Sequence, residues 1–239
     1  MKLLPARLND KPHYVFHPLR ALRRARYGGP TVEGRRETAP LPWGLPLDVN
    51  ADEAIGFTIL TTGVFDPAVS ETMHRLIDPG ELVVDVGANI GYLTSLAAAR
   101  AGSDGTVLAF EPHPRVFELL QANISAWQGR PGVATIEPHQ TALSDRDGTA
   151  ELNAGSSFEA NMGLARLDEG HASADDVLVS VTVEQLDDVI GERQIGLLKI
   201  DVEGHEPEVL RGARRLLESG RVRDIIFEDH DPYPDESTK

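Results

Sequence analysis

The sequence predicts an α/β fold, a doubly wound and mostly parallel sheet with helices on both faces. From residue 81 onward, short apolar runs alternate with helical patterns, and strands separated by helices of this length form βαβ units. Largely apolar runs such as Ile195–Ile200 are typical of strands covered on both faces. A Gly-x-x-x-Gly turn, Gly87 to Gly91, joins a strand to an alanine-rich helix, an arrangement that brings backbone N–H groups close to a ligand.

The expected elements divide the chain into a short leading part and a longer alternating part. Proline, glycine and charge over 30–42 predict a linker, and 43–49 reads as an extended or hairpin segment. Helices are expected over 17–27, 52–62, 67–77, 93–101, 114–127, 184–190 and 207–217. Strands are expected over 82–86, 106–110, 133–137, 149–152, 177–183, 196–200 and 224–227. The loop of roughly two dozen residues after 152 is typical of a lid or binding loop, with plain surface disorder as the alternative.

Composition describes a globular chain of 239 residues without cysteine. The hydrophobic and charged fractions, 41% and 26%, are those of one larger domain with a modest extension. The sequence contains no run of eighteen apolar residues, so it does not predict a membrane-spanning helix. The lack of cysteine rules out disulfides, thiolate catalysis and cysteine-ligated zinc. It also fits a reducing compartment, so we expect a cytoplasmic protein.

The net charge of −15 is unevenly distributed. Residues 1–36 hold nine Lys/Arg and two Asp/Glu, which leaves 14 and 36 for the rest of the chain. An acidic body repels phosphate backbones and argues against a nucleic-acid partner. The basic arm could contact an anionic partner or a membrane surface, although we favour a solvated leader packed loosely on the body. We therefore predict an extension and linker over 1–42 and a main domain over 43–239.

Acidic residues follow each of the expected parallel strands. In open α/β sheets, ligands bind outside the carboxyl ends of the strands, at the switch point in strand order. Glu111 comes 26 residues after Asp85, where a carboxylate can accept hydrogen bonds from ribose hydroxyls. Asp145 could accept from an adenine amino group, but it also suits a turn. The full set is Asp85, Glu111, Asp145, Asp201 with Glu203 and His205, and Glu228 with Asp229 and His230.

Four motifs together resemble the FkbM family of S-adenosylmethionine-dependent methyltransferases. They are Asp85-Val-Gly-Ala-Asn-Ile-Gly91, Glu111-Pro112, Ala142-Leu-Ser-Asp145 and Lys199-Ile-Asp-Val-Glu-Gly-His-Glu206. The resemblance implies a Rossmann-like class I methyltransferase domain whose cofactor contacts are Asp85, Gly87, Ala88, Asn89, Gly91, Glu111, Pro112 and Asp145. Two features depart from the family. Asp66 stands where the family usually has Glu, and the chain stops after the fifth main strand, where the family continues into an antiparallel edge.

The resemblance implies O-methylation of a hydroxyl on a sugar, a polyketide or another small natural product. We expect Asp201, Glu203 and His205 to form the catalytic cluster, with Asp201 or His205 as the base. Asp201, Glu228 and Asp229 could also ligate Mg²⁺, which prefers carboxylate oxygens.

Two other functions are open at this point. An NAD-dependent oxidoreductase would want a glycine where Asn89 stands, and a homologue that binds the cofactor without catalysis would keep the same loop. A homo-oligomer is also left open. We further expect Gly87→Val to abolish cofactor binding, because a branched side chain would fill space next to the ligand.

Overall fold

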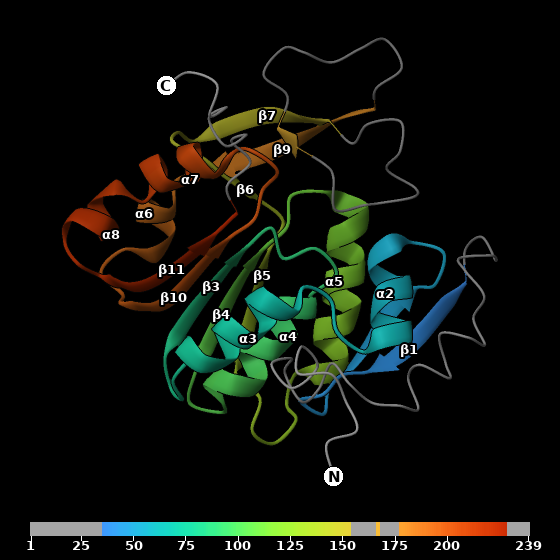
Figure 1. Ribbon diagram of the computed structural model, residues 1–239. Coiled ribbons are helices and arrows are strands. Elements are labelled where there is room, and N and C mark those ends of the chain that lie inside the picture. The colour runs from blue at the N-terminus through green and yellow to red at the C-terminus, as the bar shows by residue number, and fades with distance from the viewer. Residues whose placement is uncertain (1–34, 154–165, 168–176, 229–239) are drawn as a thin grey trace, which may run out of the picture.

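The computed structural model describes residues 35–153, 166–167 and 177–228. Its centre is a sheet of five parallel strands in the spatial order β11-β10-β3-β4-β5 (Figure 1). These strands are β3 (Leu82–Val86), β4 (Thr106–Phe110), β5 (Thr135–His139), β10 (Ile195–Ile200) and β11 (Val222–Phe227). The chain runs outward from β3 through β4 to β5 and then returns to the other side of β3. The switch point in strand order therefore lies between β3 and β10, which is where such a sheet binds ligands.

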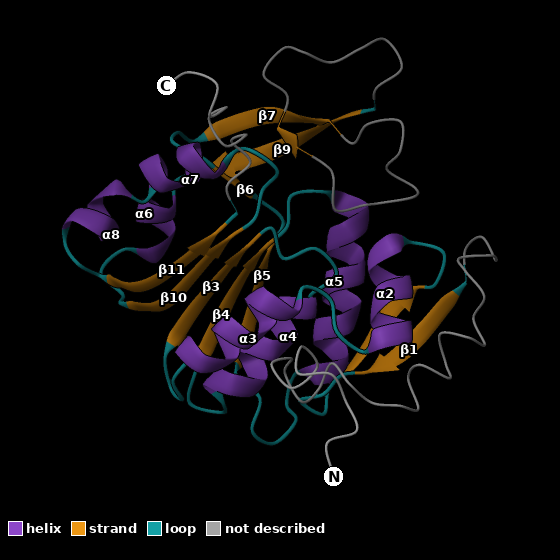
Figure 2. Cartoon of the chain, viewed as in Figure 1, coloured by secondary structure: helices purple, strands orange, loops and turns teal. Residues whose placement is uncertain are grey.

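Helices cover both faces of this sheet, as the apolar strands predicted (Figure 2). One core packs the strands against α3, α4 and α5, and the other packs them against α6, α7 and α8. Successive residues of β3 alternate between the two cores: Val83 belongs to the first, and Val84 to the second. The helices are α2 (Ala54–Thr62), α3 (Pro67–Leu76), α4 (Tyr92–Ala101), α5 (Pro114–Trp127), α6 (Leu186–Ile190), α7 (Glu206–Gly212) and α8 (Arg214–Glu218). In the part of the chain that is described, no helix has the length and apolar character to cross a membrane.

A second, smaller sheet lies across the carboxyl ends of the central strands (Figure 1). It contains β6 (Ala142–Leu143), β7 (Gly148–Asn153), β8 (Arg166–Leu167) and β9 (Leu178–Glu184) in the order β6-β9-β7-β8. The strands predicted over 149–152 and 177–183 thus exist, but they pair with each other in antiparallel fashion rather than extending the central sheet. We call this element the upper sheet.

The linker predicted over 30–42 is wrong for its last part. β1 (Arg36–Pro40) pairs along its whole length with β2 (Pro46–Asn50) in a hairpin whose turn has Gly44 in the left-handed region. The hairpin packs on α5, where Asn123 exchanges hydrogen bonds with the backbone of Asp48. Buried Leu47 and Val49 supply its apolar side. The helix predicted over 17–27 lies outside the described residues.

The single helix predicted over 207–217 is two helices, α7 and α8, that meet at Ala213. The carboxylate of Asp187 accepts hydrogen bonds from the backbone N–H groups of Arg215 and Leu216, both at 2.8 Å. A side chain thus satisfies N–H groups that begin a new helix. Periodicity alone does not reveal this break, because the acceptor comes from α6.

Candidate active site

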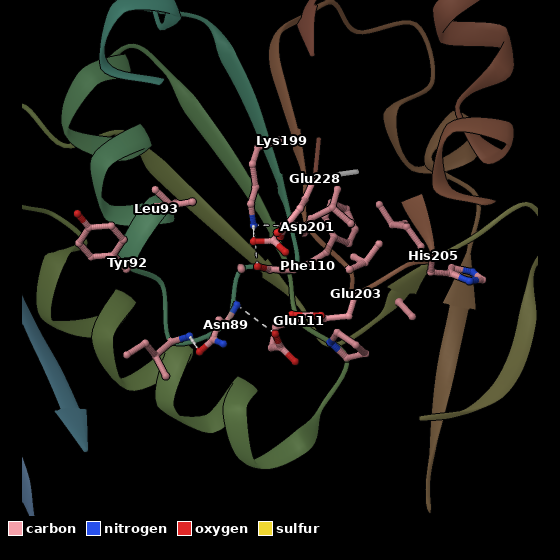
Figure 3. Close-up of a pocket in the computed structure, with 18 of the residues that line it drawn as sticks. Asn89, Tyr92, Leu93, Phe110, Glu111, Lys199, Asp201, Glu203, His205 and Glu228 are labelled. Carbon is pink, nitrogen blue, oxygen red and sulfur yellow. Dashed lines mark hydrogen bonds and ion pairs between the residues drawn. The ribbon is translucent and has the colours of Figure 1, made fainter. Parts of the chain in front are cut away.

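A pocket of about 360 Å³ opens at the switch point of the central sheet. Its walls come from the loops after β3, β4 and β10, from α2 and α4, and from the upper sheet. Figure 3 shows that Asn89, Glu111 and Asp201 come together in it from three different strand ends. Leu152 and Leu167 of the upper sheet contribute apolar walls. Residues from these three strand ends therefore line one cavity, whereas the predicted residues Asp85 and Asp145 do not.

The two glycines of the loop after β3 are required by the protein's own packing. A Cβ on Gly87 would lie 1.9 Å from the carbonyl oxygen of Asp201, and its φ is +76°. A Cβ on Gly91, where φ is +94°, would lie 2.8 Å from Leu120 and 2.9 Å from Trp127. Our reason for expecting Gly87→Val to abolish cofactor binding was therefore wrong. The added side chain collides with the backbone after β10 before any ligand is involved.

Asn89 explains how the loop departs from the dinucleotide fingerprint. Its φ is +49°, in the left-handed region that asparagine tolerates better than most residues. Its Oδ1 accepts a hydrogen bond of 2.6 Å from Ile90 N, and its own N–H donates to Glu111 Oε2 at 3.0 Å. The backbone N–H of Asn89 thus fastens the loop after β3 to the loop after β4, and the Asn89 side chain stabilises the turn of its own loop.

Glu111 is the buried acid of the pocket, with 8% of its surface exposed. Its other oxygen, Oε1, accepts a hydrogen bond of 2.9 Å from His113 N. Burial raises the pKa of Glu111 to about 7, although these backbone N–H groups and the Lys199 ammonium act in the opposite direction. The carboxyl group is therefore oriented by the backbone and titrates near neutral pH.

Asp85, predicted to contact the cofactor, lies beneath the loop and does not line the pocket. It is fully buried, Thr94 Oγ1 donates to its Oδ2 at 2.6 Å, and Lys199 Nζ lies 3.0 Å from its Oδ1. Burial alone would lower the pKa of Lys199, but the Asp85 and Asp201 carboxylates raise it above its ordinary value. Asp85 and Lys199 therefore form an ion pair inside the protein. Breaking such a pair from one side costs about 3–5 kcal/mol.

The catalytic cluster predicted after β10 is divided by the structure. Asp201, Glu203 and His205 all line the pocket, and 42% of the Asp201 side chain is exposed. Glu203 has a φ of +54°, a conformation that costs of order 1–3 kcal/mol in a residue other than glycine. Glu206 Oε1 maintains this turn by accepting hydrogen bonds from Val202 N at 3.0 Å and Gly204 N at 3.3 Å.

His205, our other candidate base, belongs to a different set of contacts. Its ring points away from Asp201 and Glu111 (Figure 3). Nε2 lies 2.9 Å from the hydroxyl of buried Ser144, and Nδ1 lies 3.7 Å from a carboxylate oxygen of Glu208. Ser144 directly follows β6, so this contact fastens the upper sheet to α7. Of the two candidate bases, Asp201 has the more exposed side chain, 42% against 11% for His205, so Asp201 is the one we propose as the base.

Some of the remaining predicted residues line the pocket, and others do not. Ala88 and Pro112 line the pocket, whereas Asp145 does not. Asp145 Oδ1 instead accepts from Ser144 Oγ at 3.2 Å and contacts Arg146 at 3.3 Å. Of the proposed metal set, Asp201 and Glu228 line the pocket and Asp229 lies outside the described residues. Among residues that the structure describes, no group of three or more His, Asp or Glu side chains is placed to hold a metal ion, so the metal set stays a prediction.

Sequence reasoning missed two side chains of the site. The sequence predicts no role for Lys199. A lysine inside a buried strand nevertheless requires an acidic partner. Tyr92 lines the pocket, and its ring makes edge contacts with Trp43 at 5.3 Å and Phe65 at 6.3 Å. The contacts of Tyr92 join three segments far apart in the chain, which no local pattern reveals.

A five-stranded parallel sheet with a glycine loop and acidic residues at its switch point has the architecture of Rossmann-like nucleotide-binding folds. The sequence profile of the methyltransferase FkbM domain matches residues 85–238, and the chain belongs to this family.

The relatives include the 31-O-demethyl-FK506 methyltransferase FkbM of Streptomyces tacrolimicus, which is 35% identical over 224 residues and 82% of each chain. Methyltransferase 1 of Beauveria bassiana is 33% identical over 54% of this chain, which spans 57% of that protein's length. The hexuronic acid methyltransferase AglP of Haloferax volcanii is 30% identical over 63% of this chain and 56% of its own.

Proposed function

We propose that this protein is an S-adenosylmethionine-dependent O-methyltransferase that acts on a hydroxyl group of a sugar, a polyketide or another small natural product. The observation that carries the proposal is the meeting of Asn89, Glu111 and Asp201 in one pocket. These residues offer a backbone loop, a buried acid and an exposed acid at the place where an α/β sheet binds a nucleotide.

The donor side of the pocket fits S-adenosylmethionine. Glu111 is buried, its orientation is fixed by two backbone N–H groups, and each carboxylate oxygen has a further lone pair for a ribose hydroxyl. Gly87, Ala88 and Asn89 of the loop after β3 line the same pocket, so the loop borders the place proposed for the cofactor. When bound, the cofactor supplies an electrophilic methyl group on a sulfonium centre.

Asp201 is suited to receive the proton of the acceptor hydroxyl. A neutral hydroxyl is a poor nucleophile, and a positioned base contributes about 10²–10⁴-fold to such a reaction. Asp201 faces the pocket, and its exposed fraction of 42% leaves its carboxylate accessible. Leu152 and Leu167 add apolar surface to the same pocket, which favours exclusion of water from the methyl group. Positioning of the two reactants supplies much of the remaining acceleration.

The names of two relatives support an oxygen acceptor on a small molecule. FkbM of Streptomyces tacrolimicus is named for 31-O-demethyl-FK506 and AglP for a hexuronic acid. One is a natural product and the other a sugar acid, so the choice of acceptor stays broad.

Two measurements test this function. Calorimetry should show binding of S-adenosylhomocysteine and no binding of NAD; the reverse would make the protein an oxidoreductase. A panel of methyl glycosides, hexuronic acids and macrolactone alcohols, incubated with tritiated-methyl S-adenosylmethionine, should then yield a labelled ether. Tight binding of S-adenosylhomocysteine without transfer to any hydroxyl would instead indicate a non-catalytic homologue.

A further inference from the structure

Lys199 lies at the junction between the donor side and the acceptor side of the pocket. It is on β10, directly opposite Asp85 of β3 in the sheet register. Only 3% of the residue is exposed, yet it is among the residues that line the pocket. Figure 3 shows the amino group extending into the space between Phe110 and Asp201. A buried ammonium at this place must act on whatever surrounds it, because it has no solvent to screen its charge.

Two of its hydrogen bonds fix the start of the cofactor loop. Nζ donates to Val86 O at 3.1 Å and to Gly87 O at 2.9 Å. Gly87 N and Ala88 N in turn donate to Phe110 O at 3.0 and 2.9 Å. Both sides of the Gly87–Ala88 peptide plane are therefore held, one by Lys199 and the other by β4. The loop cannot rotate this peptide without losing a charge-assisted bond.

The same ammonium also faces the proposed base. Its distance to Asp201 Oδ2 is 3.7 Å, within the range of an ion pair and longer than a hydrogen bond. On the opposite side it contacts the buried Asp85, which anchors it at 3.0 Å. Asp85 is itself held by Thr94 of α4. A continuous set of contacts thus runs from α4 through Asp85 and Lys199 to the Gly87 carbonyl and the Asp201 carboxylate.

We propose that Lys199 is a positioning residue for methyl transfer, which sets the distance between the cofactor loop and the carboxylate of Asp201. This inference rests on the proposed function. In-line attack depends on the placement of donor and acceptor, and an error of 1 Å in such a placement can cost about 100-fold in rate. Lys199 contacts a carbonyl of one half and a carboxylate of the other, so it can couple the two positions through one rigid group.

Chemical replacement of the ammonium gives a direct test, because the chain has no cysteine of its own. In Lys199→Cys, the single thiol is alkylated in denaturant with 2-bromoethylamine, which rebuilds a lysine-like ammonium, or with 1-bromopropane, which gives a neutral chain of the same length. Both products are then refolded. We expect the aminoethyl form to recover turnover to within about tenfold of wild type, and the propyl form to stay about 100-fold below it. Equal turnover in the two forms would overturn the proposal.

A second variant covers the case in which the neutral form fails to refold. Asp85→Asn combined with Lys199→Met removes both charges of the buried ion pair, so Asp85 is not left as a buried carboxylate without its partner. We expect a folded protein with a kcat about 100-fold below that of wild type. The matched control is Glu81→Gln combined with Arg223→Met, which removes an ion pair whose residues do not line the pocket and should keep kcat within about threefold. A folded double variant of Asp85 and Lys199 with normal kcat would contradict the inference.

Binding of S-adenosylhomocysteine to the wild-type protein, measured in parallel, distinguishes failure of the proposed function from failure of the proposed role of Lys199. No wild-type binding would overturn the proposed function and this inference together. Wild-type binding and turnover, with an equally active double variant, would overturn only the role of Lys199.

Discussion

The donor half and the acceptor half of the pocket are built in opposite ways. On the donor side, Asp85, Glu111 and Lys199 are buried and are held by backbone or by ion pairs. On the acceptor side, Asp201 and Glu228 are partly or fully exposed, and the upper sheet contributes little more than apolar side chains. A fixed half suits one invariant ligand, and an open half suits ligands that differ. The difference indicates that the donor is recognised by preorganised groups and the acceptor mainly by shape.

The largest expected effect comes from substitution of Gly87, the first glycine of the donor half. Gly87→Val places a Cβ 1.9 Å from Asp201 O, so we expect loss of the folded protein, seen as loss of the cooperative thermal transition. Gly102→Ala is the control, because that glycine also has a positive φ, +69°, but has open space around it. The control should cost about 1–3 kcal/mol, because its φ of +69° and ψ of −177° are rarely adopted by residues other than glycine. A folded Gly87→Val protein would mean that the loops after β3 and β10 separate easily.

The next effect falls on the acceptor half alone. Asp201→Asn keeps the size of the side chain and removes the proposed base, so we expect kcat to fall about 10²–10⁴-fold. The dissociation constant of S-adenosylhomocysteine, measured by calorimetry, should change less than about threefold. Equal losses in turnover and cofactor affinity would place Asp201 in the donor half instead.

Glu111 links the donor half to pH. Its pKa of about 7 means that the carboxyl is protonated below neutrality, whereas ribose hydroxyls favour the charged acceptor. Affinity for S-adenosylhomocysteine should therefore rise as pH increases from 5.5 to about 7, by up to about tenfold per pH unit, with release of a proton. Calorimetry in buffers of different ionisation enthalpy measures both quantities.

Two further observations sharpen this prediction. Glu111→Gln should flatten the pH profile, and an unchanged slope would show that another group titrates. The stability of the free protein should change in the opposite sense. Because the folded pKa is raised above 4.5, the contribution of Glu111 to stability is full below that value and is lost as pH rises through 7.

The smallest effect concerns the predicted metal set. The Lys199 ammonium lies 3.7 Å from Asp201 Oδ2, and a positive charge beside this carboxylate disfavours a second cation, so we expect excess EDTA to change turnover less than twofold. Loss of turnover with EDTA and its return with Mg²⁺ would establish a metal in the acceptor half.

The sequence predicted the donor half better than the acceptor half, for a physical reason. The strand that ends in Asp85, the glycine loop and Glu111 are neighbours in consecutive βαβ units, where local pattern determines position. His205 also lies after the end of a parallel strand, β10, but its ring contacts the hydroxyl of Ser144, 61 positions away in the sequence. The ion pair of Lys199 with Asp85 likewise depends on the register between β10 and β3, which periodicity does not specify.

Gly212 shows where the upper sheet joins the rest of the protein. A Cβ at this residue of α7 would lie 1.9 Å from the carbonyl oxygen of Ser144, just beyond β6. The fit is between backbones, so it does not depend on which side chains the upper sheet presents to the acceptor. We therefore expect side chains of β7 and β9 to be exchangeable between relatives that keep Ser144 and Gly212 without loss of this junction.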